Sequence, residues 1–318
     1  MRNNVRELLE GAFMSAVFLI LFLLTFYTPL GIASVFVLPV PLTLYAYRHS
    51  GKGRLVTFLA VMFLSFIFTS FSGVTLALPA AVLGLVMGGA YRNRKPSGQV
   101  IILGTIVSLA LFFISLTISI WIFHVNPIEL AVNASKEAIK QIQAQMGAVV
   151  DGQRAAQPGQ QQSLQQLLQT VPGLMRMIIP SSAILYSLLS AVANHAISRR
   201  VLKRMGTLIQ PLPPLRDLRF PRSILYYYFI VLLMLAVPAI SQYGFLHAVA
   251  VNVNLLMIFA FLLQALSLVA ALFYRKGWSK ALLVVVVLIF LLSPFAYILI
   301  LVGMIDVGFN LRNRLFLK

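Results

Sequence analysis

The chain has 318 residues, of which 60% are hydrophobic and 10% charged, and its mean hydropathy is +0.93. A soluble fold of this size could not remove so much apolar surface from water, so the composition excludes a soluble globular protein and indicates a membrane protein. The net charge of +18 does not indicate nucleic-acid binding, because the basic residues flank apolar runs and do not form one stripe with interleaved aromatic residues.

Long apolar runs without an ionisable side chain predict membrane-spanning helices. Residues 12–27 and 100–123 are two such runs, and they approach or reach the roughly 20 residues that cross a bilayer core. Because the runs are apolar on every face, they favour helices over the alternating strands of a β-barrel. The predicted spans cover residues 8–28, 32–47, 55–71, 74–91, 99–124, 173–198, 223–241 and 248–274.

Residues 126–172 form a polar insert between N-terminal membrane helices in 1–125 and C-terminal membrane helices in 173–318. Asn126, Pro127 and Glu129 predict the start of a helix, with Asn126 as its N-cap. The helix is amphipathic and is expected to lie on the outer membrane surface or over the bundle, before a Gln-rich linker. The insert is interpreted either as a lid or partner-docking cap, or as a solvated surface hairpin.

Residues 199–222 form a basic cytoplasmic loop with the run Pro211-Leu212-Pro213-Pro214. This composition predicts an extended polyproline II segment held near anionic lipid headgroups, or alternatively a partner-docking segment. A last apolar region at 281–310 is interrupted by Ser293-Pro294. It is too long for one untilted span and short for two, so a Pro-broken hairpin and a single ninth helix both remain open. The predicted fold is an all-α, polytopic transmembrane helix bundle of about 8 spans plus this region.

Basic residues predict which span ends share a side of the membrane. Of the 25 Lys and Arg residues, 21 fall into six clusters separated by apolar excursions that fit two-span hairpins. The positive-inside rule therefore places these clusters and the N-terminus in the cytoplasm. The clusters are Arg2/Arg6, Arg48/Lys52/Arg54, Arg92/Arg94/Lys95, the seven between Arg199 and Arg222, Arg275/Lys276/Lys280, and Arg312/Arg314/Lys318.

The sequence contains no catalytic constellation, so it predicts a protein that is not an enzyme and that holds no cofactor or metal. The absence of cysteine excludes disulfides and thiolate chemistry. The four histidines, His195 among them, are interpreted as single residues near span ends. Asp306 is the one carboxylate inside an apolar run. It is expected to face the bundle interior, water or a basic partner, or to lie near the cytoplasmic interface.

Polar residues along the predicted eighth span and beyond suggest a solute site. The candidate substrate-binding residues are His247, Asn252, Asn254, Gln264 and Asp306. A small-molecule site that opens outward is one interpretation, and hydrogen bonding between helices is the other.

Small residues on the first span suggest close helix contacts. Gly11/Ser15 and Ala12/Ala16 are two small-xxx-small pairs, which indicate either a partner interface or internal packing. Gly84, Gly88 and Gly89 have the same two interpretations.

The order of features resembles the YybS-like family of uncharacterised bacterial integral membrane proteins, over essentially the whole chain. The residues that carry the resemblance are Glu10–Ala16, Leu38–Pro41, the insert before residue 173, and Gly303–Asn310. The resemblance implies residence in the bacterial plasma membrane. That family is distantly similar to the S components of energy-coupling-factor (ECF) transporters, in which an Ala-x-x-x-Ala pattern meets a coupling subunit, and Ala12 and Ala16 match that pattern.

The first functional hypothesis is an S-component-like subunit that binds or transports a small solute. The alternative is a membrane scaffold or assembly factor that recruits proteins through the outer insert and the cytoplasmic loop. The expected partners are the lipid bilayer, anionic lipid headgroups, an unknown small solute, and a membrane coupling subunit or other membrane proteins. Nucleic acid is not expected as a partner.

Overall fold

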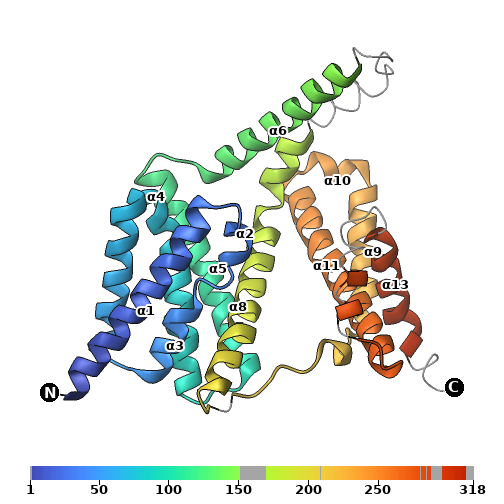
Figure 1. Ribbon diagram of the computed structural model, residues 1–318. Coiled ribbons are helices and arrows are strands. Elements are labelled where there is room, and N and C mark those ends of the chain that lie inside the picture. Colours follow the sequence, from blue (N-terminus) through green and yellow to red (C-terminus); the bar gives the residue numbers. More distant parts are fainter. Residues whose placement is uncertain are drawn as a thin grey trace. The chain divides into compact units, whose positions relative to one another are not determined.

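The computed structural model describes residues 2–150, 170–207, 209–279, 281–283, 285–287 and 296–312 (Figure 1). Contacts divide the chain into two compact units, which are described separately below. Unit 1 comprises Met1–Pro172 and Ser182–Leu212, and unit 2 comprises Gly173–Ser181 and Pro213–Lys318. All regular elements of the described residues are helical, which confirms the predicted all-α class.

Several helices are long and apolar enough to cross a membrane. They are Val5–Tyr27, Lys52–Arg92, Ser97–Trp121 and Gly244–Arg275, and the pair Thr170–Met177 with Ile179–Arg204 makes a fifth if it is counted as one span. Ser223–Ala236 and Tyr297–Phe309 are shorter apolar helices. By length and composition, the described residues therefore form a multi-pass membrane protein.

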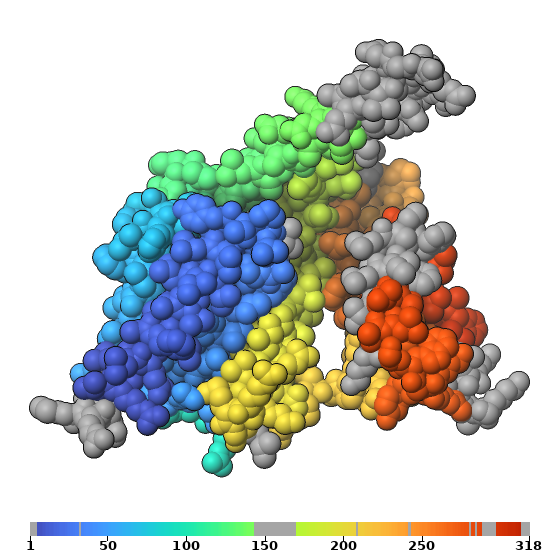
Figure 2. Space-filling view, in the orientation of Figure 1, coloured from blue at the N-terminus to red at the C-terminus, as the bar shows by residue number. Residues whose placement is uncertain are grey.

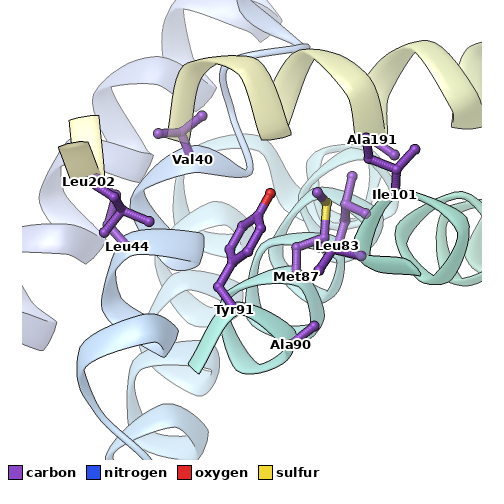
Figure 3. Packing of buried hydrophobic residues seen from close by; sticks show 10 residues of the cluster. Val40, Leu44, Leu83, Met87, Ala90, Tyr91, Ile101, Ala191 and Leu202 are labelled. Carbon is purple, nitrogen blue, oxygen red and sulfur yellow. The ribbon is translucent and has the colours of Figure 1, made fainter. Parts of the chain in front are cut away.

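Unit 1 is a bundle of helices from both sides of the polar insert. Its elements are α1 (Arg2–Tyr27), α2 (Gly31–Ser34), α3 (Val40–Arg48), α4 (Lys52–Arg92), α5 (Ser97–Trp121), α6 (Pro127–Val150) and most of α8 (Ile179–Arg204). One core cluster joins α3, α4, α5 and α8, with Tyr91 among Leu44, Met87 and Leu202 (Figure 3). A second cluster packs Phe18 and Phe22 of α1 against α3 and α4.

Helix α4 has 41 residues and folds back on itself. A straight helix of this length would extend about 60 Å, which would hold Arg54 and Gly89 far apart. Instead, a Cβ built on Gly89 would lie 3.1 Å from the Arg54 guanidinium. The reversal occurs at Ser70, whose φ of 55° and ψ of −151° are not helical. The two halves match the separately predicted spans 55–71 and 74–91.

The predicted span 32–47 is divided between two short helices, because three prolines interrupt this part of the chain. Pro39 directly precedes α3 and Pro41 lies in its first turn. Seven consecutive α3 residues, 40–46, are buried. Glycines of α4 allow this burial: a Cβ at Gly84 would overlap the Pro39 carbonyl oxygen, and one at Gly88 would overlap that of Thr43.

The outer face of unit 1 is apolar. Phe13 of α1 is 65% exposed and Ile102 of α5 is 61% exposed, and Figure 2 shows α1 on the surface in blue. Exposed apolar side chains along span-length helices are expected where lipid is the solvent.

Unit 2 contains η1 (Leu215–Asp217), α9 (Ser223–Ala236), α10 (Pro238–Gln242), α11 (Gly244–Arg275) and α13 (Ala296–Phe309). Gly303 of α13 packs on the α11 backbone at Phe261, and Asp306 contacts Gln264 one turn further along both helices. Helices α11 and α13 therefore run parallel. Whether residues 281–310 form a Pro-broken hairpin or a single ninth helix stays a prediction. Ser293 and Pro294 lie outside the described residues.

Basic residues meet at one end of each unit. In unit 1, the Arg92 guanidinium donates to the Arg48 carbonyl oxygen over 2.8 Å, and Arg54 donates to that of His49 over 2.7 Å. In unit 2, the Arg216 guanidinium lies 3.6 Å from the centre of the Tyr274 ring, next to Arg275. Lys280, Arg314 and Lys318 lie outside the described residues.

Helix α6 begins as the sequence predicts. The backbone N–H groups of Ile128 and Glu129 donate to the Asn126 side-chain oxygen over 3.0 and 3.4 Å, which satisfies two groups that a helix start leaves unpaired. The Gln-rich tract that follows α6 lies outside the described residues.

Candidate functional site

A buried ion pair lies at the end of α13 in unit 2. The Arg312 Nε lies 3.4 Å from the Asp306 Oδ2, and the two side chains are 2% and 1% exposed. Gln264 of α11 donates its Nε2–H to the same carboxylate oxygen over 2.5 Å. The pKa of Arg312 lies below its usual value, mainly because the side chain is buried. The Asp306 carboxylate opposes this shift, and the nearby charge of Arg219 adds to it. A guanidinium keeps its proton in proteins, so the pair is ionic.

A tight turn after α13 brings Arg312 back to Asp306. Asn310 follows the last helical residue with a φ of 53°, in the left-handed region that asparagine tolerates. Its N–H donates to the Asp306 carbonyl oxygen over 2.9 Å. The Arg312 N–H then points at the Asp306 Oδ1 from 3.4 Å. The turn thus delivers both the backbone and the side chain of Arg312 to one carboxylate.

The same network holds the loop that precedes α9. Arg312 donates Nη1–H to the Arg216 carbonyl oxygen over 2.5 Å and Nη2–H to the Ser267 Oγ over 2.8 Å. The Ser267 hydroxyl lies within reach of the carbonyl oxygens of Leu215 and Leu218, and its single proton serves one of them at a time. Gln264, Ser267, Asp306 and Arg312 are called the Asp306 cluster below.

A second contact fixes the loop beside the pair. The Phe220 N–H donates to the Gln264 Oε1 over 3.0 Å, so one glutamine amide joins the loop backbone to the Asp306 carboxylate. Together, these bonds attach residues 215–220 to α11 and to the end of α13.

A pocket of about 210 Å³ opens beside the Asp306 cluster. It is lined by Arg219, Phe220, Pro221, Arg222, Gln264, Asp306, Val307, Asn310 and Arg312. The lining carries three guanidinium groups and one carboxylate. Arg219 and Arg222 are exposed, and within the described part of the chain neither side chain has a hydrogen bond or an ion pair. This site is called the Arg219 pocket.

Comparison with known proteins identifies the family. The model of the family described as "Predicted membrane protein (DUF2232)" matches residues 16–307. The chain belongs to this family. The chain is also 26% identical over 314 residues to the "Uncharacterized protein YybS" of Bacillus subtilis (strain 168), an alignment that covers 98% of this chain and 99% of that protein. No solved structure matches the chain. The YybS-like resemblance is therefore confirmed, while the similarity to S components stays a prediction.

In this DUF2232 protein, the predicted solute-binding residues divide into two groups. Gln264 and Asp306 meet in the Asp306 cluster. Asn252 precedes Gln264 by 12 residues of the same helix, or about 18 Å along its axis. His247 and Asn254 are half-buried on that distant part of α11, and neither they nor Asn252 line the Arg219 pocket. A role for these three in solute binding stays a prediction.

The Asn252 side chain joins two segments of unit 2. Its Nδ2 donates to the carbonyl oxygens of Met177 and Ala248, each over 2.7 Å. Its Oδ1 accepts from the Ser181 N–H over 2.9 Å. These contacts correspond to the second interpretation of the polar residues, hydrogen bonding between helices.

The small residues of α1 face in two directions. Gly11 is buried beside Tyr45 and Thr57, and Ser15 is only 3% exposed. This pair packs inside unit 1 and is not accessible to a partner. Ala12 and Ala16 are exposed on the outer face of α1, and their role as a partner interface stays a prediction.

Unit 1 contains a buried polar cluster that the sequence interpretation missed. His195, expected near a membrane interface, is only 2% exposed, and its Nδ1 lies 2.7 Å from the Tyr91 hydroxyl. The neighbouring Asn194 donates to the Thr43 Oγ1 over 3.0 Å and accepts from the Ser198 hydroxyl over 3.0 Å. The helical spacing of Ser187, Ser190, Asn194 and Ser198 is the sequence signal that indicates a buried polar face.

No group of three or more His, Asp or Glu side chains placed to hold a metal ion occurs among the described residues.

Proposed function

We propose that this chain is a non-enzymatic, multi-pass protein of the bacterial plasma membrane, with a cytoplasmic N-terminus, that binds a small solute in the Arg219 pocket. The observation that carries the proposal is a pocket of about 210 Å³ next to a fully buried ion pair. Ion pairs buried at this depth add little net stability compared with well-packed apolar residues. A role in shaping a binding site gives a reason for the pair to be present.

The pocket is pre-organised, which favours ligand binding because little ordering is needed when the ligand arrives. The loop backbone is held on either side of Arg219. The Phe220 N–H donates to Gln264, the Arg216 carbonyl oxygen accepts from Arg312, and the Leu218 carbonyl oxygen lies within reach of the Ser267 hydroxyl. Pro221 has a fixed φ and directly precedes Arg222. Both guanidinium groups therefore extend from a backbone with a defined position.

The proposal is that the solute reaches the pocket from the cytoplasmic side. The pocket lies where Arg216, Arg275 and Arg312 gather, and the positive-inside rule assigns such ends to the cytoplasm. This differs from the outward-opening site suggested by His247, Asn252 and Asn254. The sequence has no nucleotide-binding loop of the Gly-x-x-x-x-Gly-Lys type, so active transport would use a partner ATPase or an ion gradient. Exposed Ala12 and Ala16 are the proposed contact for a coupling subunit.

A second candidate function is a membrane scaffold or assembly factor, and helix α6 is the observation that favours it. This helix of 24 residues is capped at its start, and Val132 is the one residue buried in the part whose side chains are described, 127–142. An amphipathic helix with so much free surface is suited to bind a protein partner. The basic loop 199–222 would offer a further surface.

Retention of a small molecule during purification tests the proposal. The wild-type chain, extracted in mild detergent, is expected to carry a small molecule that mass spectrometry detects after denaturation. The Arg219→Ala/Arg222→Ala variant is expected to lose it, because both guanidinium groups are removed from the pocket. The matched control is Lys203→Ala/Arg204→Ala, which removes the same charge from exposed positions of unit 1 and is expected to retain the molecule. Equal retention by both variants would refute a site in this pocket.

A further inference from the structure

We infer that the solute of the Arg219 pocket carries a phosphoryl group, recognised by the guanidinium groups of Arg219 and Arg222. The inference rests on the proposed function and adds the chemical class of the ligand.

The charge of the lining favours an anion. Arg219, Arg222 and Arg312 supply three positive charges and Asp306 supplies one negative charge, which leaves a net charge of +2. A phosphate monoester carries about −1.5 to −2 at neutral pH, and the phosphodiester of a phospholipid headgroup carries one negative charge, so the positive charge of the lining compensates either group. Planar guanidinium groups bind phosphoryl oxygens through paired hydrogen bonds, a geometry that lysine does not provide. Two arginines three residues apart, with no side-chain partner among the described residues, therefore match one phosphoryl group.

The carboxylate in the lining does not oppose this ligand. The Asp306 Oδ2 already contacts the Gln264 amide and the Arg312 Nε, and its Oδ1 faces the Arg312 N–H. A carboxylate neutralised in this way repels an anion only weakly. With this carboxylate neutralised, the remaining charges of the pocket are positive, so a cation is not the favoured ligand.

The size of the pocket limits what surrounds the phosphoryl group. At about 210 Å³, the pocket lies below the roughly 300–1,000 Å³ of sites that enclose a drug-sized ligand. It therefore fits a phosphoryl group with a few further atoms. Two sources have this chemistry: a small phosphorylated solute, and the headgroup of an anionic phospholipid. Basic pockets at the cytoplasmic ends of membrane helices are known to take such headgroups.

Thermal unfolding of the full chain in detergent tests the inference and separates the two sources. One arm adds inorganic phosphate against potassium chloride and potassium acetate of equal ionic strength. The other adds phosphatidylglycerol to the micelles against a galactosyl diacylglycerol, which has no phosphate. We expect one of the two phosphoryl probes to raise the Tm by about 2 °C or more over its controls. A response to phosphate assigns a free solute, and a response confined to phosphatidylglycerol assigns a lipid headgroup.

The variant arm uses Arg219→Gln/Arg222→Gln, which keeps polar side chains at exposed positions and is expected to unfold near the wild-type Tm without a probe. The double variant is expected to lose the rise in Tm caused by the probe, and each single variant is expected to lose part of it. The control Lys203→Ala/Arg204→Ala is expected to keep the full response. The inference is overturned if no phosphoryl probe exceeds its controls, if acetate acts as strongly as phosphate, or if the glutamine variant responds like wild type. A retained molecule that lacks phosphorus and depends on Arg219 and Arg222 would overturn this inference and leave the proposed function intact.

Discussion

The Asp306→Ala variant is expected to lose about 3–5 kcal/mol of folding stability, the cost of leaving one partner of a buried ion pair without its counter-ion. Arg312 is only 2% exposed, so removing the carboxylate leaves a charged side chain largely buried. Removing the carboxylate also leaves the Gln264 amide without an acceptor. The loop 215–220 is held by the Arg312 guanidinium and the Gln264 amide. Its attachment to α11 should therefore weaken when these two groups lose the Asp306 carboxylate.

Because each unit contains one tryptophan, tryptophan fluorescence can follow the unfolding of one unit at a time. Trp278 packs edge-on against Phe273 in unit 2, with ring centres 4.9 Å apart, and Trp121 belongs to unit 1. A Trp121→Phe background therefore reports the unfolding of unit 2 alone. In that background, Asp306→Ala should lower the Tm strongly, and Asp306→Leu/Arg312→Met should recover most of the loss because an apolar pair replaces the ionic one.

The control for Asp306 lies in the same unit. Asp217 makes a 3.8 Å ion pair with Arg216, and its side chain is 59% exposed. Exposed pairs contribute about 0–1 kcal/mol, so Asp217→Ala should unfold close to the wild-type Tm. Equal, small shifts for Asp217→Ala and Asp306→Ala would contradict the buried ion pair.

The Gly303→Ala variant is expected to lose about 1–3 kcal/mol, the usual cost of forcing an extra methyl group into a packed interface. A Cβ at this position would overlap the Phe261 carbonyl oxygen and lie 3.2 Å from the Ala265 nitrogen. Both are backbone atoms of α11 and cannot rotate away. Helix α13 would have to move outward, and Asp306 lies one turn further along the same helix.

The matched control is Gly308→Ala, a chemically identical change on the same helix. There the new methyl group would lie 3.3 Å from the Leu225 Cδ1, which is the end of a flexible side chain. Since alanine also favours helix over glycine by about 1 kcal/mol, Gly308→Ala should be neutral or stabilising. The Tm in the Trp121→Phe background separates the two variants. A Gly303→Ala protein that unfolds at or above the Gly308→Ala Tm would contradict the close contact of α11 and α13.

Local patterns predicted part of this structure because they depend on neighbouring residues alone. The start of α6 follows from Asn126 and Pro127, whose roles need no tertiary contact. The two halves of α4 follow from the length of the apolar run, since a single straight helix would exceed the bilayer. The expected basic partner for Asp306 follows from the cost of a charge in an apolar run.

Long-range pairings could not be predicted in the same way. Which residue neutralises Asp306 depends on the left-handed turn at Asn310, and Gln264 reaches it across 42 positions. In the sequence, Arg312 belongs to a basic cluster of the kind that flanks membrane spans. No feature of the sequence indicates that its side chain is buried. The contacts of His195 with Tyr91 and of Asn194 with Thr43 also join distant helices. Polar residues near span ends look alike whether they face headgroups or a helix interface.

Labelling of single cysteines in intact cells tests the central claim, that the basic ends of both units and the Arg219 pocket face the cytoplasm. The chain has no cysteine, so each introduced thiol reports one position. Lys95→Cys in unit 1 and Asp217→Cys in unit 2 are expected to react with a membrane-impermeant maleimide only after the cells are permeabilised. Val125→Cys and Phe245→Cys, at the opposite helix ends, are expected to react in intact cells. Reaction of Lys95→Cys and Asp217→Cys from opposite sides of the membrane, or of Asp217→Cys in intact cells, would contradict the account.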